Sequence, residues 1–242
     1  MRFFYGSVKS GFWKYLSSAL QAHDPTDTPA LPNGEPDFSL RRREAINLLE
    51  DNNILMTDSL YRTNRFENRD EDKNLWRPSD TFAYQNSQTN LKIMEYLEEF
   101  PTIDGLFFTA TVTASKSPFF WFRQAMRGHI EQPPNWNFIA GRRWHSILKI
   151  DSRYYQTFLL PTPKPRGIHF TDNQRLESFV NYLQSIDNDF YKEIAHIPKA
   201  TRTPIQNTML SAHREAFLVE CFRQAIVLRN QDFNGTVLPN GA

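Results

Sequence analysis

The sequence predicts an α/β fold in which helices cover both faces of a mostly parallel sheet. Short apolar runs alternate along the chain with segments whose apolar residues recur at helical spacing. The apolar runs are joined by helical or long connections, as parallel strands require. The chain has 242 residues, of which 40% are hydrophobic, so it is long enough for one large core. We expect one domain over residues 1–229, followed by a polar, glycine-containing tail over residues 230–242.

Four short apolar runs are the predicted strands. They cover residues 54–57, 105–109, 146–150 and 156–160. The first run ends at Thr57-Asp58, so Asp58 should lie at the carboxyl end of a buried strand. Ligands of open α/β sheets bind at this edge.

The helices are predicted from periodicity and from their start and stop signals. The first helix is a periodic stretch over residues 10–21, and the second is capped by Ser39. The third has Leu91, Met94 and Leu97 on its inward face and ends before Pro101, and the fourth starts at Ser117-Pro118 and stops at Gly128. A capping box over residues 171–174 starts the fifth, and Thr203-Pro204 starts the last.

Composition restricts the functional classes. A formal net charge of +1 means that a nucleic-acid site must be a local patch. No apolar run reaches the ~20 residues of a membrane span, and the single Cys221 fits a reducing cytoplasm. The six histidines have no partner at ligand spacing, and no glycine-rich phosphate loop is present. We therefore expect no metal, no cofactor, no membrane contact and a monomeric protein.

Three segments end in polar loops that could meet at one edge of the sheet. They are the aromatic opening with Phe4, Tyr5 and Ser7, the strand end at Thr57-Asp58, and the stiff basic loop over residues 161–166. Together they would form a pocket with an aromatic wall, a carboxylate and a rigid cationic loop.

These segments resemble the uracil-DNA glycosylase superfamily, nearest to its mismatch-specific, thymine and hypoxanthine branches. The stretch over residues 4–7 with Phe12-Trp13 is similar to the aromatic stretch of that branch, and Thr57-Asp58 with Arg62 is similar to its Thr-Asp/Asn…Arg strand end. Residues 160–163, Leu-Pro-Thr-Pro, resemble the second signature motif. The order and spacing of the three segments agree with the family between residue 3 and about residue 166.

The resemblance implies a three-layer αβα fold and hydrolysis of the N-glycosidic bond of a damaged or modified base flipped out of double-stranded DNA. Tyr5, with Phe4 and Ser7, would hold the base. Asp58 would stabilise the positive charge that develops on the sugar. Contacts with DNA would come from Arg62 and Thr162 and, through phosphates, from Lys164 and Arg166. The expected location is the cytoplasm, at the nucleoid, in DNA repair or in defence against modified foreign DNA.

Two departures from the family leave an alternative open. The Gly-x-x-Pro motif that positions water in the family has no counterpart before Tyr5, and we expect the natural chain to start further upstream. Leu160 stands where the uracil-specific enzymes carry a histidine. The alternative function is a non-catalytic nucleic-acid-binding protein that retains the fold. The alternative interpretations are that Tyr5 is a core aromatic, that Asp58 is a helix cap and that the cations of the basic loop are merely solvated.

Overall fold

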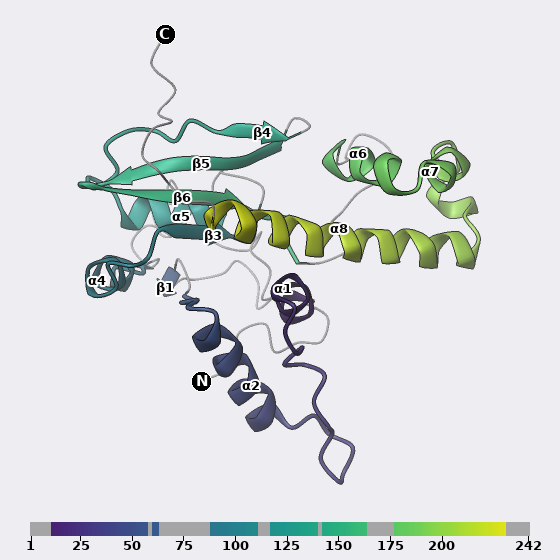
Figure 1. Ribbon diagram of the computed structural model, residues 1–242, viewed down its shortest axis with the longest axis horizontal. Coiled ribbons are helices and arrows are strands. Elements are labelled where there is room, and N and C mark those ends of the chain that lie inside the picture. The colour runs from purple at the N-terminus through teal and green to yellow at the C-terminus, as the bar shows by residue number, and fades with distance from the viewer. Residues whose placement is uncertain are drawn as a thin grey trace. The chain divides into compact units, whose positions relative to one another are not determined.

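The computed structural model describes residues 11–57, 60–62, 88–110, 117–139, 142–163 and 177–230 (Figure 1). The chain divides into two compact units, the first formed by Met1–Leu48 with Pro163–Ala242 and the second by Leu49–Thr162. The sequence-based expectation of one domain over residues 1–229 stays a prediction, and its tail lies almost wholly outside the described residues.

A four-stranded mixed sheet organises the second unit. Its order is β3-β6-β5-β4, with bounds β3 Gly105–Phe108, β4 Asn137–Ile139, β5 Arg142–Ile150 and β6 Arg153–Leu159. Together with the helices, this sheet confirms the α/β class. Three of the four predicted strands are present, as β3, the second half of β5 and most of β6.

The expectation of a mostly parallel sheet is wrong. Only β3 and β6 run parallel, whereas β5 is antiparallel to both β6 and β4. The physical reason lies in Asp151-Ser152, the two residues between β5 and β6. Asp151 has a positive φ of 50°, and a connection of this length can join only antiparallel strands.

Residues 54–57 do not form the predicted buried strand. The segment has no regular structure, and Leu55 is 45% exposed. It directly follows helix α2 (Phe38–Asp51), where the amide of Ile54 donates to the carbonyl of Leu49 and closes the last turn of the helix. A run of three apolar residues fits the end of a helix as well as a strand, and periodicity could not separate the two.

One face of the sheet carries the core of the second unit. In β5 the residues at 144, 146, 148 and 150 are buried and those between them are half-exposed, which is the alternation of a strand with one covered face. Helices α4 (Lys92–Glu99) and α5 (Pro118–Ala125) pack on the covered face. The core cluster consists of Ile93, Leu97, Phe108, Phe119, Phe122, Ala125, Met126, Leu148, Ile150, Tyr155 and Leu159.

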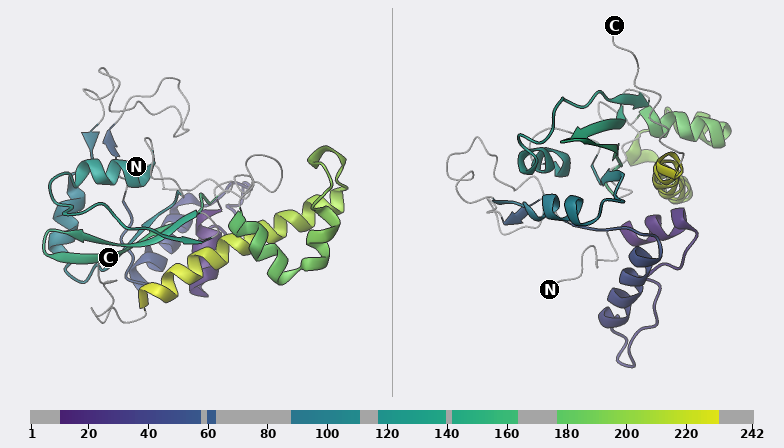
Figure 2. Two further views of the ribbon diagram at one scale, coloured as in Figure 1. Left: turned by 90° about the horizontal axis from the view of Figure 1, so that it is seen from above. Right: turned by 60° about the vertical axis from the view of Figure 1, so that its left-hand side comes forward.

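The helix signals around this core are only partly confirmed. Ser117 caps α5 by accepting a hydrogen bond from the amide of Phe120 at 3.1 Å, and Gly128 has a φ of +94° just past the helix end. Leu97 is buried as predicted, but Leu91 is 64% exposed. A separate two-stranded sheet, β1 (Leu60–Arg62) with β2 (Gln88–Thr89), contacts α5 (Figure 2).

Arg153 joins the start of β6 to the end of α4. Its guanidinium donates to the carbonyl oxygens of Leu97 at 2.6 Å, Pro101 at 2.6 Å and Ile103 at 2.9 Å. Carbonyls at a helix C-terminus lack partners within the helix, and a cation there also interacts favourably with the helix dipole. One side chain thus fixes the segment that leads from α4 into β3.

We expect Arg153→Lys to lower the free energy of unfolding by about 1–2 kcal/mol. An ammonium group carries all its donors on one nitrogen, so it cannot span the carbonyls that Nη1 and Nη2 reach separately. The measurement is the urea midpoint. Arg127→Lys, a change of the same kind at an exposed residue, is the control and should leave the midpoint unchanged. Equal midpoints for Arg153→Lys and the wild type would show that the three hydrogen bonds contribute nothing net.

The first unit is helical. Its helices are α1 (Phe12–Leu20), most of α2, α6 (Glu177–Ile186), α7 (Asn188–Ile194), the short 3₁₀ helix η4 (Lys199–Thr201) and α8 (Pro204–Asn230). α1 packs against α8 (Figure 2), where the rings of Phe12 and Phe222 meet edge to face at 6.0 Å and Lys14 pairs with Glu215 at 2.7 Å. Phe12 is therefore a core residue of this unit.

The cap of α2 is Asp37 and not the predicted Ser39. One carboxylate oxygen of Asp37 accepts from the amides of both Ser39 and Leu40. Arg41 in the next turn is 8% exposed, and its Nε donates to the hydroxyl of Thr28 at 3.2 Å. Arg41 is thus part of the packing of this loop and does not belong to a solvated face.

Within the described part of the chain, no helix combines the length and the apolar character needed to cross a membrane.

Candidate functional site

The carboxyl ends of β3 and β6 meet at one edge of the sheet because these two strands are parallel. The amide of Leu160 donates to the carbonyl of Phe108 at 2.8 Å, so the ladder continues one residue beyond β6. Pro161 is then buried and Thr162 is exposed. The Leu-Pro-Thr-Pro segment singled out in the sequence therefore begins at the edge where parallel sheets place their ligands.

A row of side chains crosses the sheet one residue before this edge. Phe107 of β3 lies opposite Phe158 of β6, Phe158 opposite His145 of β5, and His145 opposite Asn137 of β4. The rings of Phe107 and Phe158 stack at 5.1 Å with an interplanar angle of 15°, and the imidazole of His145 lies 4.9 Å from Phe158 on the other side. We call these four residues the aromatic row.

The two ends of the aromatic row differ in character. Phe107 stands on the edge strand of the sheet and is 41% exposed, whereas Phe158 is fully buried. At the other end the side-chain amide nitrogen of Asn137 lies 3.3 Å from Nδ1 of His145. The row therefore offers an apolar ring face at one end and hydrogen-bonding groups at the other, which is a combination suited to planar heterocycles.

His145 is held in its neutral form. Partial burial lowers the pKa of its imidazole below the ordinary 6.5, and a hydrogen bond with the side chain of Gln156 opposes this shift to a smaller extent. Gln156 belongs to β6 two residues before Phe158, on the same face, and is 8% exposed. A neutral imidazole has one donor and one acceptor nitrogen, and here Nδ1 lies against the side chain of Asn137 while Nε2 is buried.

The lowered pKa of His145 predicts a pH dependence of stability. Between the folded-state value and 6.5, the unfolded chain binds more protons than the folded chain, so the free energy of unfolding rises with pH. The stabilisation is complete above about 6.5 and is lost as the pH falls towards the folded-state pKa. His145→Gln should remove this part of the slope in urea midpoints measured from about pH 5 to 7.5, whereas His23→Gln, at an exposed histidine, should keep it. Parallel profiles for His145→Gln and the wild type would contradict the assignment.

Most of the site residues predicted from the sequence lie outside the described residues. These are Phe4, Tyr5, Ser7, Asp58, Lys164 and Arg166. Of the two that are described, Thr162 is exposed at the carboxyl edge, and Arg62 belongs to β1 opposite Gln88. Arg62 is therefore on the two-stranded sheet, and Thr162 follows the four-stranded one.

Thr57, which precedes Asp58, is fixed by a side-chain contact. Its hydroxyl accepts a hydrogen bond from the side-chain amide of Asn90 at 2.9 Å. Asn90 is 8% exposed and stands between β2 and α4. The segment that leads to Asp58 is thus attached to the region where the two-stranded sheet joins the core helices.

The sequence did not identify His145, Gln156 or Phe107 as site residues. The predicted strand began at Ser146, so His145 fell outside it, although β5 starts at Arg142. The alternation from Trp144 to Ile150 is the signal that would have included His145, because it places that residue on the half-exposed face. No local signal could have brought Phe107 next to Phe158, since their pairing joins strands far apart in sequence.

Comparisons of the chain with protein-family models, with curated proteins and with solved structures gave no match.

Proposed function

We propose that this protein is a DNA glycosylase that extracts a deaminated or otherwise modified base from double-stranded DNA and hydrolyses its N-glycosidic bond. The observation that carries the proposal is the aromatic row, which lies beside the edge where the Leu-Pro-Thr-Pro segment begins. An extruded base needs a ring face to stack on and polar groups to read its edge. The ordered set of sequence segments that resembles the uracil-DNA glycosylase superfamily supports the same function.

In the proposed mechanism the base is received by Tyr5, with Phe4 and Ser7, as the resemblance implies. Within the second unit, the exposed ring of Phe107 is the candidate stacking surface. Asp58 acts on the reacting bond: departure of the base leaves positive charge on the sugar, and a carboxylate fixed nearby lowers the energy of that state. Water supplies the hydroxyl group that replaces the base at the sugar carbon, and the base leaves with a proton.

The remaining predicted contacts hold the DNA. Lys164 and Arg166, on a loop stiffened by prolines, neutralise phosphates, and Thr162 stands at the start of that loop. Arg62 adds a contact from the two-stranded sheet. The three-layer αβα arrangement and a location in the cytoplasm at the nucleoid belong to the same proposal.

The decisive experiment is a glycosylase assay on duplexes that each carry one modified base, including uracil, hypoxanthine and thymine opposite guanine. Excision leaves an abasic site, which hot alkali converts into a strand break. We expect cleavage of at least one labelled strand and none of the unmodified duplex. A full panel without cleavage, from protein that binds the same duplexes, would reject the enzymatic function.

The same experiment evaluates a second function, binding of nucleic acid without excision. The irregular structure of residues 54–57 favours it, because Asp58 then does not follow a buried strand that would fix a catalytic carboxylate. Retained binding without strand breaks at any base is the result expected of such a protein.

A further inference from the structure

Arg41 holds a buried guanidinium cation against the loop that precedes α2. The residue is 8% exposed, and its Nε donates to the hydroxyl of Thr28 at 3.2 Å. Its Nη1 is also buried and has no hydrogen-bond partner in the described part of the chain. A buried donor without a partner is costly, and a buried charge is costlier still unless an opposite charge neutralises it. Arg41 therefore combines a fixed position with a donor that no described group uses.

The charge of Arg41 is not paired within the protein. Among the described residues, none of the ion pairs includes Arg41. Two carboxylates of the loop fix its shape instead: one oxygen of Asp37 accepts from two amides of the first turn of α2, and one oxygen of Asp24 accepts from the amide and the hydroxyl of Thr26. The hydroxyl of Thr28 is neutral, so it leaves the positive charge of Arg41 uncompensated.

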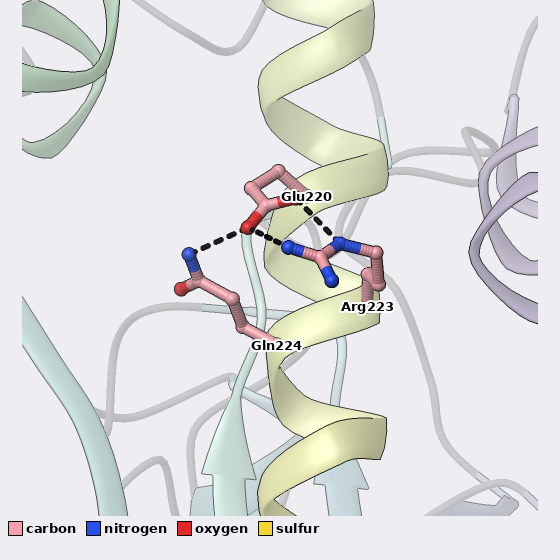
Figure 3. Close-up of polar contacts among 3 residues, drawn as sticks. All are labelled: Glu220, Arg223 and Gln224. Atoms are coloured by element: carbon pink, nitrogen blue, oxygen red, sulfur yellow. Dashed lines mark hydrogen bonds and ion pairs between the residues drawn. The ribbon is translucent and has the colours of Figure 1, made fainter. Parts of the chain in front are cut away.

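An arginine with a partner, Arg223 of α8, provides the contrast (Figure 3). Its side chain is 52% exposed, and two of its nitrogens donate to the two carboxylate oxygens of Glu220 at 2.7 Å each. Gln224 donates to the same carboxylate at 2.8 Å. Water and a carboxylate thus both stabilise the cation of Arg223, whereas Arg41 has lost most of its contact with water and has one neutral hydroxyl in exchange.

We propose that Arg41 and Thr28 form a binding site for a phosphate group. The guanidinium supplies paired N–H donors, which match the oxygens of a tetrahedral oxyanion. Thr28 accepts from Arg41, so its own O–H can donate to the same anion. Arg42 and Arg43, both exposed, add positive charge near an end that the helix dipole already makes positive. Phosphate has more charge and more acceptor oxygens than a carboxylate, so it suits this combination better.

The test is thermal unfolding of the full chain in sodium phosphate, sodium acetate and sodium chloride of the same pH and ionic strength. A ligand that binds only the folded state stabilises it, and phosphate at about ten times its dissociation constant should raise the melting temperature by roughly 3–6 °C above the value in chloride. Acetate should give the chloride value. Equal melting in phosphate and chloride, or an equal rise in acetate, would overturn the assignment of a phosphate site.

Three variants connect this rise to the proposed site. Arg41→Met should melt at the same temperature in all three salts. Because it removes a buried charge without a partner, we expect it to be at least as stable as the wild type in chloride. Arg41→Lys keeps the charge but loses the planar fork, so its response to phosphate should be reduced. Thr28→Val keeps the shape and removes the hydroxyl, and its response should also be reduced.

Arg223→Met is the matched control. It makes the same substitution at an exposed arginine that Glu220 already pairs, so it should keep the wild-type response to phosphate. A wild-type response in Arg41→Met would overturn the proposal. So would the same loss of response in both methionine variants, because it would indicate a general effect of removing positive charge.

Duplex DNA distinguishes two sources of the phosphate group. The site rests on α2 and its loop, and it does not depend on the proposed excision of bases. If the backbone of DNA is the source, Arg41→Met lowers the slope of log binding constant against log salt by about one unit. If the site takes a free phosphate compound, the slope stays unchanged while the response to inorganic phosphate is lost. Either result identifies the source of the phosphate that Arg41 binds.

Discussion

Asp58→Asn is expected to reduce base excision by about 10²–10³-fold while binding of the same duplex changes little. Asparagine keeps the shape of the side chain and removes its charge, so the variant isolates the electrostatic contribution. The loss should appear in the rate of a single turnover with enzyme in excess, where release of product plays no part. Binding is measured separately by fluorescence anisotropy.

Asp51→Asn is the matched control for this variant. It makes the same change seven positions earlier, at an exposed residue in the last turn of α2. We expect wild-type excision from Asp51→Asn. Full activity in Asp58→Asn would move the catalytic role to another group, and an equal loss in both variants would indicate a general effect of removing negative charge.

Phe107→Ala should weaken binding of a duplex that carries one uracil opposite guanine by about 5- to 150-fold, if this ring receives the extruded base. Phe107 is the outer ring of the aromatic row, and its inner neighbour Phe158 is fully buried. Removing the outer ring therefore removes the stacking surface that a base could reach. Anisotropy titration with a labelled duplex gives the two dissociation constants.

The control for this prediction is Phe100→Ala. Phe100 is also 41% exposed but is the C-cap residue of α4 and belongs to none of the strands that carry the aromatic row. Phe107→Leu separates stacking from simple apolar contact, because it keeps much of the volume and loses the ring face. Similar dissociation constants for Phe107→Ala and Phe100→Ala, in variants with the wild-type urea midpoint, would exclude Phe107 from the base-binding surface.

The elements predicted correctly are those with a strong local cause. Ser117 caps α5 because a short hydroxyl side chain can accept a hydrogen bond from an amide of the first turn. Position 128, just past that helix, has a positive φ, and glycine adopts this conformation at little cost. The run at Gly105–Phe108 is short and apolar, and it forms β3. In each case a few neighbouring residues contain the whole signal.

Other expectations failed where two local structures fit the same residues. Leu55 is apolar but 45% exposed, because a run of three such residues is too short to specify a strand. Asp37 and Ser39 can both cap a helix, and the choice depends on which side chain reaches two amides at once. Asp151-Ser152 reverses the chain between β5 and β6, whereas the sequence pattern predicts parallel strands on either side of it.

The sequence by itself determined the α/β class, the starts of several helices and three of the four strands it named, because these follow from periodicity and capping within a few residues. Only the tertiary structure decided the direction of the strands and the assembly of the aromatic row. Phe107, Phe158 and His145 come from three strands, and their contact depends on the register of both pairings.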